Sequence, residues 1–219
     1  MAGSVVPATS ITRVFLLDDH AAVRRGVAEV LATEPDFVVV GEAGTAAQAL
    51  ARVPELAPDV AVLDVRLPDG DGVTVCRELL SRVPHVHCVL LTSMAEEHAQ
   101  LAAILAGASA YQLKQIRATA LVEAIRAVAT GREPLDRQQL AAAVARALSA
   151  SATSGNRLSE PERSALASII EGRTNQEIGA EMALPEDAVR ELVCHLLTKL
   201  DLQRRISSTA VAGELPVGS

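Results

Sequence analysis

Five short runs of aliphatic residues, each followed by polar residues, constrain the fold of this chain more than any other feature. They lie at residues 14–17, 37–41, 60–63, 86–91 and 110–113. Continuous apolarity implies burial on both faces, as for parallel strands between two layers of helices. Amphipathic stretches follow the runs, at residues 21–32, 45–53, 73–82, 96–106 and 118–130. This alternation predicts a doubly wound α/β domain with a five-stranded parallel sheet.

The polar residues after the runs suggest a site. Asp18 and Asp19 follow the first run, Asp64 the third, Thr92 the fourth and Lys114 the fifth. The carboxyl ends of parallel strands meet at one edge of a sheet, where ligands bind. Three carboxylates there repel one another unless a cation lies among them, and such oxygen ligands suit Mg²⁺. A hydroxyl and an ammonium group would stabilise the oxygens of a phosphoryl group on a central carboxylate.

Asp64 is the expected nucleophile, because a tight loop at residues 67–72 follows it closely. Carboxylate attack on phosphorus gives an aspartyl phosphate. His20 stands beside Asp19, and we interpret it as the polar start of a helix rather than as a metal ligand. A Mg²⁺-dependent phosphohydrolase would also use an acidic site, but its nucleophile belongs to a paired Asp-x-Asp motif that Asp64 lacks. The sequence therefore predicts phosphotransfer without a dedicated metabolic reaction.

The C-terminal part of the chain is predicted to be all-helical. An amphipathic, alanine-rich stretch at residues 133–150 precedes a small, polar linker candidate at 149–156. Further helices are expected at residues 159–171, 175–182, 186–200 and 207–214. The predicted division is therefore an α/β domain at residues 12–131, a helical linker at 132–156 and an all-α domain at 157–215.

Local signals mark the helix ends in this last region. Gly172 is a C-terminal stop, and Thr174 is an N-cap for the helix at 175–182. Pro185 fits the first turn of the next helix. A short helix joined by residues 183–185 to a longer one has the spacing of a helix-turn-helix.

Several stretches resemble a known family over residues 12–212, nearly the whole chain. Those in the first domain are VFLLDDHAAVRRG, LDVRLPDGDG and GASAYQLK. They are similar to the flavodoxin-like receiver domain of bacterial two-component response regulators, in particular the NarL/FixJ subfamily. The stretch from Leu158 to Arg205 resembles the LuxR-type helix-turn-helix domain of the same subfamily.

The resemblance implies roles for the residues at the strand ends. Asp64 would accept phosphate from a sensor histidine kinase, and Lys114 would pair with the phosphoryl group. Thr92 would follow that group, and Tyr111 would change rotamer with it. The Mg²⁺ ligands would be Asp18, Asp19, Asp64 and the backbone carbonyl of Arg66. Gln115, after Lys114, departs from the acidic residue, Gly or Pro that the family often carries there.

The same resemblance implies a dimeric, DNA-binding transcription regulator. Its DNA contacts would be Thr174, Asn175, Asp187, Arg190, Glu191 and Lys199. The helix at 186–200 should face the core with Val189, Val193, Leu196, Leu197 and Leu200.

The charge of this domain is unfavourable for binding DNA. Asp187 and Glu191 are acidic where the family usually carries cationic or amide donors. Residues 156–219 hold seven Lys and Arg against ten Asp and Glu, a net charge of −3. Duplex DNA is bound mainly through cations that displace its counterions, although a Glu can accept a hydrogen bond from cytosine. Two functions stay open: a DNA-binding transcription regulator, or a regulator that acts through protein contacts or as a heterodimer with a relative.

Composition excludes several other classes. Aromatic residues make up 1% of the 219 residues, so base stacking on aromatic platforms is not expected. Cys76, Cys88 and Cys194 lie far apart, without the spacing of a zinc site. No apolar run reaches the length of a membrane span, and residues 1–12 lack the pattern of a signal peptide. A cytoplasmic protein is expected.

Overall fold

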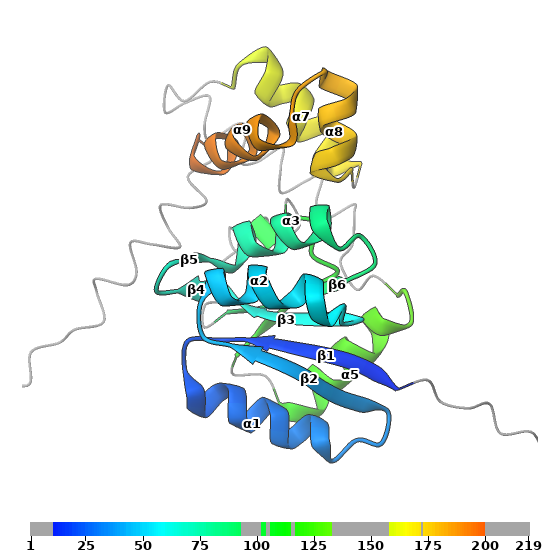
Figure 1. Cartoon of the computed structure of the whole chain (residues 1–219). Helices are drawn as coiled ribbons and strands as arrows, with labels where there is room; N and C mark the ends of the chain where they lie inside the picture. Colours follow the sequence, from blue (N-terminus) through cyan, green and yellow to red (C-terminus); the bar gives the residue numbers. More distant parts are fainter. Residues whose placement is uncertain are drawn as a thin grey trace, which may run out of the picture.

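A computed structural model describes residues 11–92, 102–103, 106–114, 117–132, 158–171 and 173–199. Its centre is a five-stranded parallel sheet in the order β2-β1-β3-β6-β7 (Figure 1). The strands are β1 (Thr12–Leu17), β2 (Phe37–Ala43), β3 (Val60–Asp64), β6 (His87–Thr92) and β7 (Ala110–Leu113). All five apolar runs thus form the predicted sheet.

Helices cover both faces of this sheet. The helices α1 (Ala21–Ala32) and α5 (Ala118–Ala129) pack together on one face, and α2 (Ala46–Leu56) and α3 (Gly72–Arg82) on the other. Alternate residues of β1 point to the two layers: Val14 and Leu16 join the core under α1 and α5, and Phe15 and Leu17 the core under α2 and α3. This is the arrangement that strands buried on both faces require.

The structure differs from the sequence-based expectation in two places within this domain. Helix α2 runs three residues beyond the predicted end at Val53 and stops at Ala57, which adopts a left-handed conformation. The loop after Asp64 contains a small antiparallel hairpin, β4 (Arg66–Leu67) with β5 (Gly70–Asp71). Most of the helix expected at 96–106, the helices at 133–150 and 207–214 and the linker at 149–156 lie outside the described residues.

Three helices form the C-terminal domain: α7 (Glu160–Ile170), α8 (Asn175–Met182) and α9 (Glu186–Lys199). Thr174 caps α8 as predicted, in a capping box with Glu177. Pro185 stands directly before α9 rather than in its first turn, and its carbonyl accepts a hydrogen bond from the Val189 amide. The turn between α8 and α9 packs closely, because a Cβ on Gly179 would lie 2.8 Å from the Leu184 carbonyl oxygen.

The predicted core face of α9 is confirmed where its side chains are described. Val189, Val193 and Leu196 are buried, and the side chains of Leu197 and Leu200 lie outside the described set. The C-terminal domain lies beside α3 of the α/β domain, on the side away from α1 (Figure 1). Among the described residues, no helix is long and apolar enough to cross a membrane.

Candidate functional site

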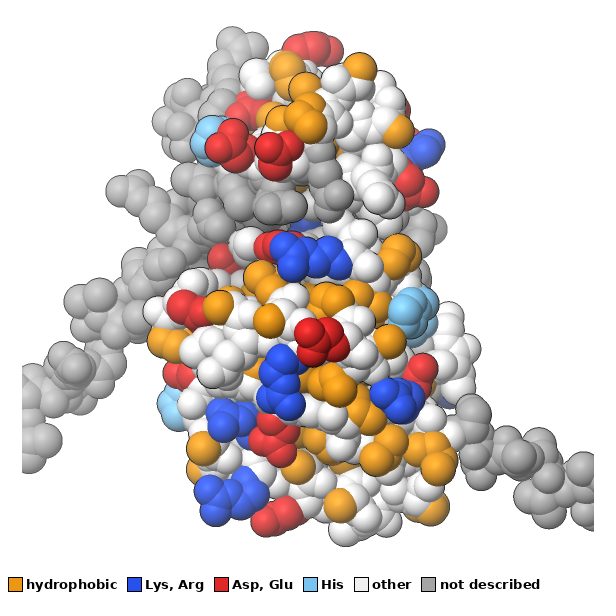
Figure 2. Space-filling model, in the orientation of Figure 1, with side chains coloured by type: hydrophobic (Ala, Val, Ile, Leu, Met, Phe, Trp, Pro, Cys, Tyr) orange, Lys and Arg blue, Asp and Glu red, His pale blue; other side chains and the backbone are white. Residues whose placement is uncertain are grey.

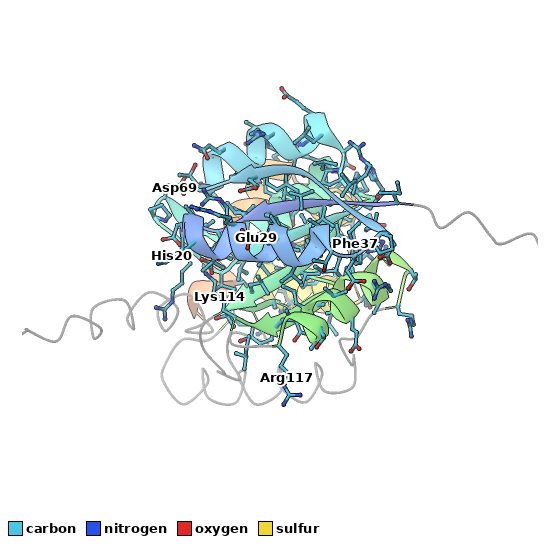
Figure 3. All side chains as sticks on the ribbon, turned by 90° about the horizontal axis from the view of Figure 1, so that it is seen from below. His20, Glu29, Phe37, Asp69, Lys114 and Arg117 are labelled. Atoms are coloured by element: carbon cyan, nitrogen blue, oxygen red, sulfur yellow. The ribbon has the colours of Figure 1, made fainter. Side chains whose placement is uncertain are left out.

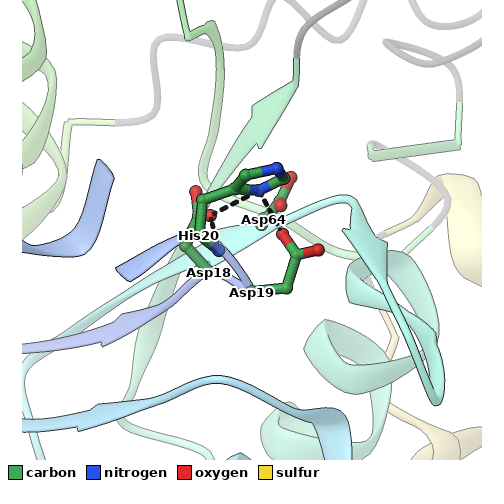
Figure 4. A group of neighbouring side chains, drawn as sticks. All are labelled: Asp18, Asp19, His20 and Asp64. Carbon is green, nitrogen blue, oxygen red and sulfur yellow. Dashed lines mark hydrogen bonds and ion pairs between the residues drawn. The ribbon is translucent and has the colours of Figure 1, made fainter. Parts of the chain in front are cut away.

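The carboxyl ends of the strands bring the predicted acidic residues together. Because β1 pairs in parallel with β3, with Leu17 opposite Leu63, the residues that follow these two lie side by side. Asp18 and Asp64 are only 3% and 2% exposed, whereas Asp19 is exposed. One ligand atom from each of Asp18, Asp19, His20 and Asp64 lies within 4.8 Å of the others (Figure 4).

Lys114 brings a positive charge into this cluster from the end of β7. Its Nζ atom lies 2.7 Å from Asp64 Oδ2, to which it donates a hydrogen bond, and 2.6 Å from Asp18 Oδ2. The second contact is an ion pair only, since Asp18 Oδ2 has no hydrogen bond of suitable geometry among the described residues. The backbone amide of Lys114 donates to the Thr92 carbonyl, which ties this end of β7 to β6. Lys114 therefore spans the two buried carboxylates.

Burial dominates the electrostatics of Asp64. Loss of water raises the pKa of its carboxyl to about 6, although Lys114 opposes this shift. Asp18 adds to the rise through like-charge repulsion. Burial works against the charge of Lys114 as well, but the two carboxylates outweigh it and raise the pKa of this lysine. At neutral pH the lysine is charged, and most of Asp64 is ionised.

The ligand atoms that this cluster offers are suited to a divalent cation. Three carboxylates face a single lysine, so an excess of negative charge remains among oxygens that are partly out of water. Hard cations such as Mg²⁺ prefer such ligands and keep several waters. The exposed Asp19 leaves the cluster open to solvent on one side.

The loop that carries Asp64 is held tightly. A Cβ at Gly72 would lie 2.1 Å from the Asp64 carbonyl oxygen, so only glycine lets α3 begin there. Asp71 caps α3 through a hydrogen bond from the Thr74 amide. Asp69, at the tip of the hairpin, accepts hydrogen bonds from the amides of Ala46 and Ala47 at the start of α2. In Figure 3, Asp69, His20 and Lys114 lie at one end of the sheet and Phe37 at the other.

Three further contacts were not foreseen from the sequence. His20 is the N-cap of α1, which agrees with its interpretation as the polar start of a helix, but it makes no capping bond. The position of its Nδ1 atom, 2.5 Å from Asp19 Oδ1, was not predicted. Arg24 donates to the backbone carbonyl of Asp18 and so supports the end of β1. The link from Asp69 to α2 spans 23 residues, and a local pattern such as Pro-Asp-Gly does not reveal its partner. The adjacency of His20 to Asp19 was the one available signal.

The other predicted site residues occupy nearby strands. Thr92 is buried at the end of β6, beside β3, and Tyr111 is half-buried in β7. The backbone amide of Arg66 donates to Asp64 Oδ1 over 3.2 Å.

The predicted DNA contacts are divided between surface and interior. Asp187 and Glu191 are exposed on α9, and Thr174 is half-buried as the N-cap of α8. Asn175 is only 1% exposed. It accepts a hydrogen bond from Arg77 of α3, so it is not at the surface in this conformation. The side chains of Arg190 and Lys199 lie outside the described set.

Comparison with known proteins identifies the class. Residues 14–126 match the family model described as the response regulator receiver domain. The chain is also 32% identical over 203 residues to the transcriptional regulatory protein LiaR of Bacillus subtilis, covering 91% of this chain and 96% of that protein. The chain therefore belongs to the two-component response regulators, in the subfamily with a LuxR-type helix-turn-helix domain.

A more similar relative is the DNA-binding transcriptional activator DevR/DosR of Mycobacterium tuberculosis. It is 46% identical over 207 residues, which cover 94% of this chain and 95% of the relative. Among solved structures, the receiver domain of the regulator NarL from M. tuberculosis matches with a TM-score of 0.54 and 34% identity, over 56% of this chain and 99% of that one. A LuxR-family regulator from Aurantimonas sp. SI85-9A1 matches with a TM-score of 0.55 and 32% identity, over 60% and 96%.

Proposed function

We propose that this response regulator is phosphorylated on Asp64 and that the phosphorylation controls a DNA-binding transcription regulator. The observation that carries the first part is the buried carboxylate of Asp64, held 2.7 Å from Lys114 inside an acidic cluster at the end of a central strand. Its raised pKa, near 6, leaves an ionised and poorly hydrated oxygen at neutral pH. Such an oxygen is a suitable nucleophile toward phosphorus.

In the proposed step, an Asp64 carboxylate oxygen attacks the phosphorus of a phosphohistidine on a sensor kinase. The oxygen–phosphorus bond forms, the phosphorus–nitrogen bond breaks, and the imidazole leaves with its electron pair. Lys114 already lies at Asp64 Oδ2, and its charge would stabilise the phosphoryl oxygens together with the hydroxyl of Thr92. Asp18, Asp19, Asp64 and the carbonyl of Arg66 would hold Mg²⁺, which neutralises negative charge at the site when bound.

Labelling of the intact chain tests this assignment. Acetyl phosphate with Mg²⁺ should add one acid-stable, base-labile phosphoryl group, visible by intact mass, and Asp64→Asn should add none. Glu29→Gln, which changes an exposed carboxylate on α1, is the matched control and should be labelled normally. Full labelling of Asp64→Asn would show that the nucleophile lies elsewhere.

Dependence on the metal is tested separately. Millimolar Mg²⁺ should raise the midpoint of thermal unfolding, because it binds the folded state and relieves repulsion in the cluster. Asp19→Asn should lose most of this gain. A wild-type midpoint that does not respond to Mg²⁺ would contradict a metal site here.

The DNA-binding role is supported by the helix-turn-helix of α8 and α9 and by the names of the relatives. We propose that the chain acts at DNA as a dimer, with the domain division at residues 12–131, 132–156 and 157–215. The buried face of α9 leaves Asp187 and Glu191 on the opposite, exposed face. A location in the cytoplasm stays a prediction.

The acidic face of α9 favours a second candidate, in which the protein signals through protein contacts or as a heterodimer. On the side seen in Figure 2, most of the charged side chains of the C-terminal domain at the top are acidic, and most of the basic ones lie on the receiver domain. Carboxylates near phosphate repel it and contribute no counterion release.

Genome-wide binding by the intact protein distinguishes the two candidates. A DNA-binding regulator should occupy discrete sites, and Asp187→Lys with Glu191→Asn should strengthen binding and steepen its dependence on salt. Absence of sites for the wild type, together with capture of DNA by the double variant, would favour the second candidate.

A further inference from the structure

Asp69 is an exposed carboxylate at the end of the sheet that carries the acidic cluster (Figure 3), and both of its oxygens are bonded. Its Oδ1 atom accepts a hydrogen bond from the Ala46 amide over 2.8 Å, and its Oδ2 atom accepts one from the Ala47 amide over 3.0 Å. The two amides belong to the first turn of α2, where N–H groups have no partner within the helix. The hydrogen bonds from Ala47 and Ala46 lower the pKa of the Asp69 carboxyl. A charged side chain therefore links the hairpin of β4 and β5 to α2.

Helix α2 does not need this link in order to form. It has its own N-cap, Thr45, whose side chain accepts the Gln48 amide over 3.3 Å. Asp69 and Ala47 are both exposed, so water can replace the carboxylate at the Ala47 amide. A hydrogen bond that water can replace contributes little net stability. The contact spans 23 residues of sequence, and its main consequence is that two segments keep a fixed relative position.

The hairpin that Asp69 holds also carries one of the proposed metal ligands. Arg66 of β4, whose backbone carbonyl is that ligand, pairs with Asp71 of β5. Asp71 in turn accepts the Thr74 amide over 2.8 Å and so fastens one end of the hairpin to α3. Asp69 fastens the tip of the hairpin to α2. The segment between Asp64 and α3 is thus attached to a helix on each side.

The other half of the acidic cluster is attached to the same part of the molecule. The Asp18 amide donates to the Ala43 carbonyl over 3.2 Å, at the end of β2. Arg24 donates to the Asp18 carbonyl and lies against the next residue, since a Cβ on Gly44 would be 3.5 Å from its Nη1 atom. The loop of Asp18 and Asp19 therefore rests on the residues that lead into α2. The start of α2 is a common support for both ligand loops.

We propose that Asp69 is a positioning residue, which holds the backbone carbonyl of Arg66 in place for the metal ion. This inference rests on the proposed phosphotransfer at Asp64 and extends the account of its metal site. Asp69 itself touches neither the ion nor the phosphoryl group and acts through Arg66.

The physical reason is the conformational freedom of the loop. A carbonyl on a loose loop must be ordered when the ion binds, and this ordering opposes binding. The link to α2 orders the loop before the ion arrives. Removal of a group that supports a metal ligand commonly lowers metal affinity by about 10- to 100-fold. Loss of the Asp69 carboxylate should therefore weaken Mg²⁺ binding more than it weakens the fold.

Mg²⁺ affinity of the full-length protein is measured by competition with Mn²⁺, whose unbound form is counted by electron paramagnetic resonance. Asp69→Ala should weaken Mg²⁺ binding by about tenfold. Asp59→Ala is the matched control, because Asp59 also accepts a backbone amide, that of Arg13, over 2.7 Å, but lies directly before β3 at the opposite end of that strand. It should bind Mg²⁺ as the wild type does. Wild-type affinity in Asp69→Ala would overturn the positioning role.

A second variant separates position from charge. Asp69→Asn loses the same charge as Asp69→Ala but keeps one oxygen that can accept an amide of α2. Its Mg²⁺ affinity should therefore lie between those of the wild type and Asp69→Ala. Equal affinities of the Asn and Ala variants would mean that the charge of Asp69 acts through space, and the positioning role would fall.

The rate of labelling by acetyl phosphate tests the same role during phosphotransfer. Asp69→Ala should need about tenfold more Mg²⁺ for half of its maximal rate and should reach the wild-type rate at saturating Mg²⁺. A rate lowered by the same factor at limiting and at saturating Mg²⁺ would indicate general damage to the site and contradict the inference. Absence of Mg²⁺ binding by the wild type would overturn the proposed metal site and this inference with it. Equal binding by the wild type and Asp69→Ala would overturn this inference alone.

Discussion

Two cations of this protein, the half-buried Lys114 and the buried Arg77, are held in opposite ways. Lys114 lies between the carboxylates of Asp18 and Asp64, which raise its pKa. Arg77 donates to the neutral oxygens of Asn175 and Arg173, and burial lowers its pKa. The first arrangement concentrates charge at a place where chemistry is proposed to occur. In the second arrangement, a charged side chain connects two domains through hydrogen bonds.

The contrast shows that the stability cost of removing a cation depends on the charge of the groups that accept its hydrogen bonds. A lysine between two buried carboxylates is costly to remove, because its loss leaves two unpaired negative charges out of water. The neutral oxygens of Asn175 and Arg173, to which Arg77 donates, are atoms that water reaches once the domains part. We therefore expect the receiver domain to depend strongly on Lys114 for its stability and only weakly on Arg77.

The largest effect on stability is expected at Gly72, which lies against the backbone of Asp64 at the start of the helix that carries Arg77. Gly72→Ala would place a Cβ 2.1 Å from the Asp64 carbonyl oxygen, so the backbone of α3 or of the loop must move. We expect a loss of about 2 to 4 kcal/mol in the free energy of unfolding, measured by urea denaturation. Gly26→Ala, which meets no neighbouring atom within 4 Å on α1, is the control and should cost nothing. Equal stability of the two variants would contradict the tight packing of α3 on Asp64.

Next in size is the comparison of the two cations themselves. In EDTA at pH 7.5, Lys114→Met should lower the free energy of unfolding by about 2 to 3 kcal/mol, because it leaves two buried carboxylates unpaired. Added Mg²⁺ should restore part of the loss. Arg77→Met should cost less than about 1 kcal/mol in the same assay. A larger cost for Arg77→Met than for Lys114→Met would reverse the comparison.

The pH dependence of Asp64 gives a smaller effect of opposite sign. Because its pKa is about 6 in the folded protein against 3.8 for an ordinary aspartate, the folded state binds more protons between these values. The stability that Asp64 contributes is complete below about pH 4 and is lost as pH rises through about 6. In EDTA, Asp64→Asn should therefore be more stable than wild type at pH 7.5, by on the order of 1 to 2 kcal/mol.

The gain for Asp64→Asn should disappear near pH 4, where the wild-type carboxyl is protonated. Thermal unfolding at several pH values measures it, with Asp36→Asn as the control. Asp36 has a lowered pKa because of its hydrogen bond with Arg126, so its substitution should destabilise the protein at neutral pH. A gain that is the same at pH 4 and pH 7.5 would mean that burial does not raise the pKa of Asp64.

The smallest effect on stability is expected in the C-terminal domain, at the N-cap of α8. Thr174→Ala removes the N-cap of α8 and should cost about 1 kcal/mol, the usual value for a lost cap. Thr174→Ser keeps a hydroxyl and should cost less. The Glu177 amide donates a hydrogen bond to Thr174 Oγ1, so its hydrogen exchange rate reports directly on whether the cap is formed. Unchanged exchange at this amide would show that the cap does not form in solution.

Local sequence patterns were sufficient for most of the architecture. Helices α1 and α8 have the predicted bounds, and all five apolar runs became strands. Helix α2 extends past its predicted end at Val53 and includes Pro54 in its last turn. The hairpin of β4 and β5 was not distinguished from a plain tight loop, since two residues per strand leave no alternation to detect.

For the candidate site, the strand ends identified Asp18, Asp19, Asp64, Thr92 and Lys114, because polar residues that follow apolar runs must meet at one edge of a parallel sheet. Which charges touch was decided by tertiary structure: the reach of Lys114 to both buried carboxylates depends on strand order and side-chain direction. The contact of Arg77 with Asn175 carries no sequence signal at all. It joins two amphipathic helices 98 residues apart, and only the packing of one domain on the other brings them together.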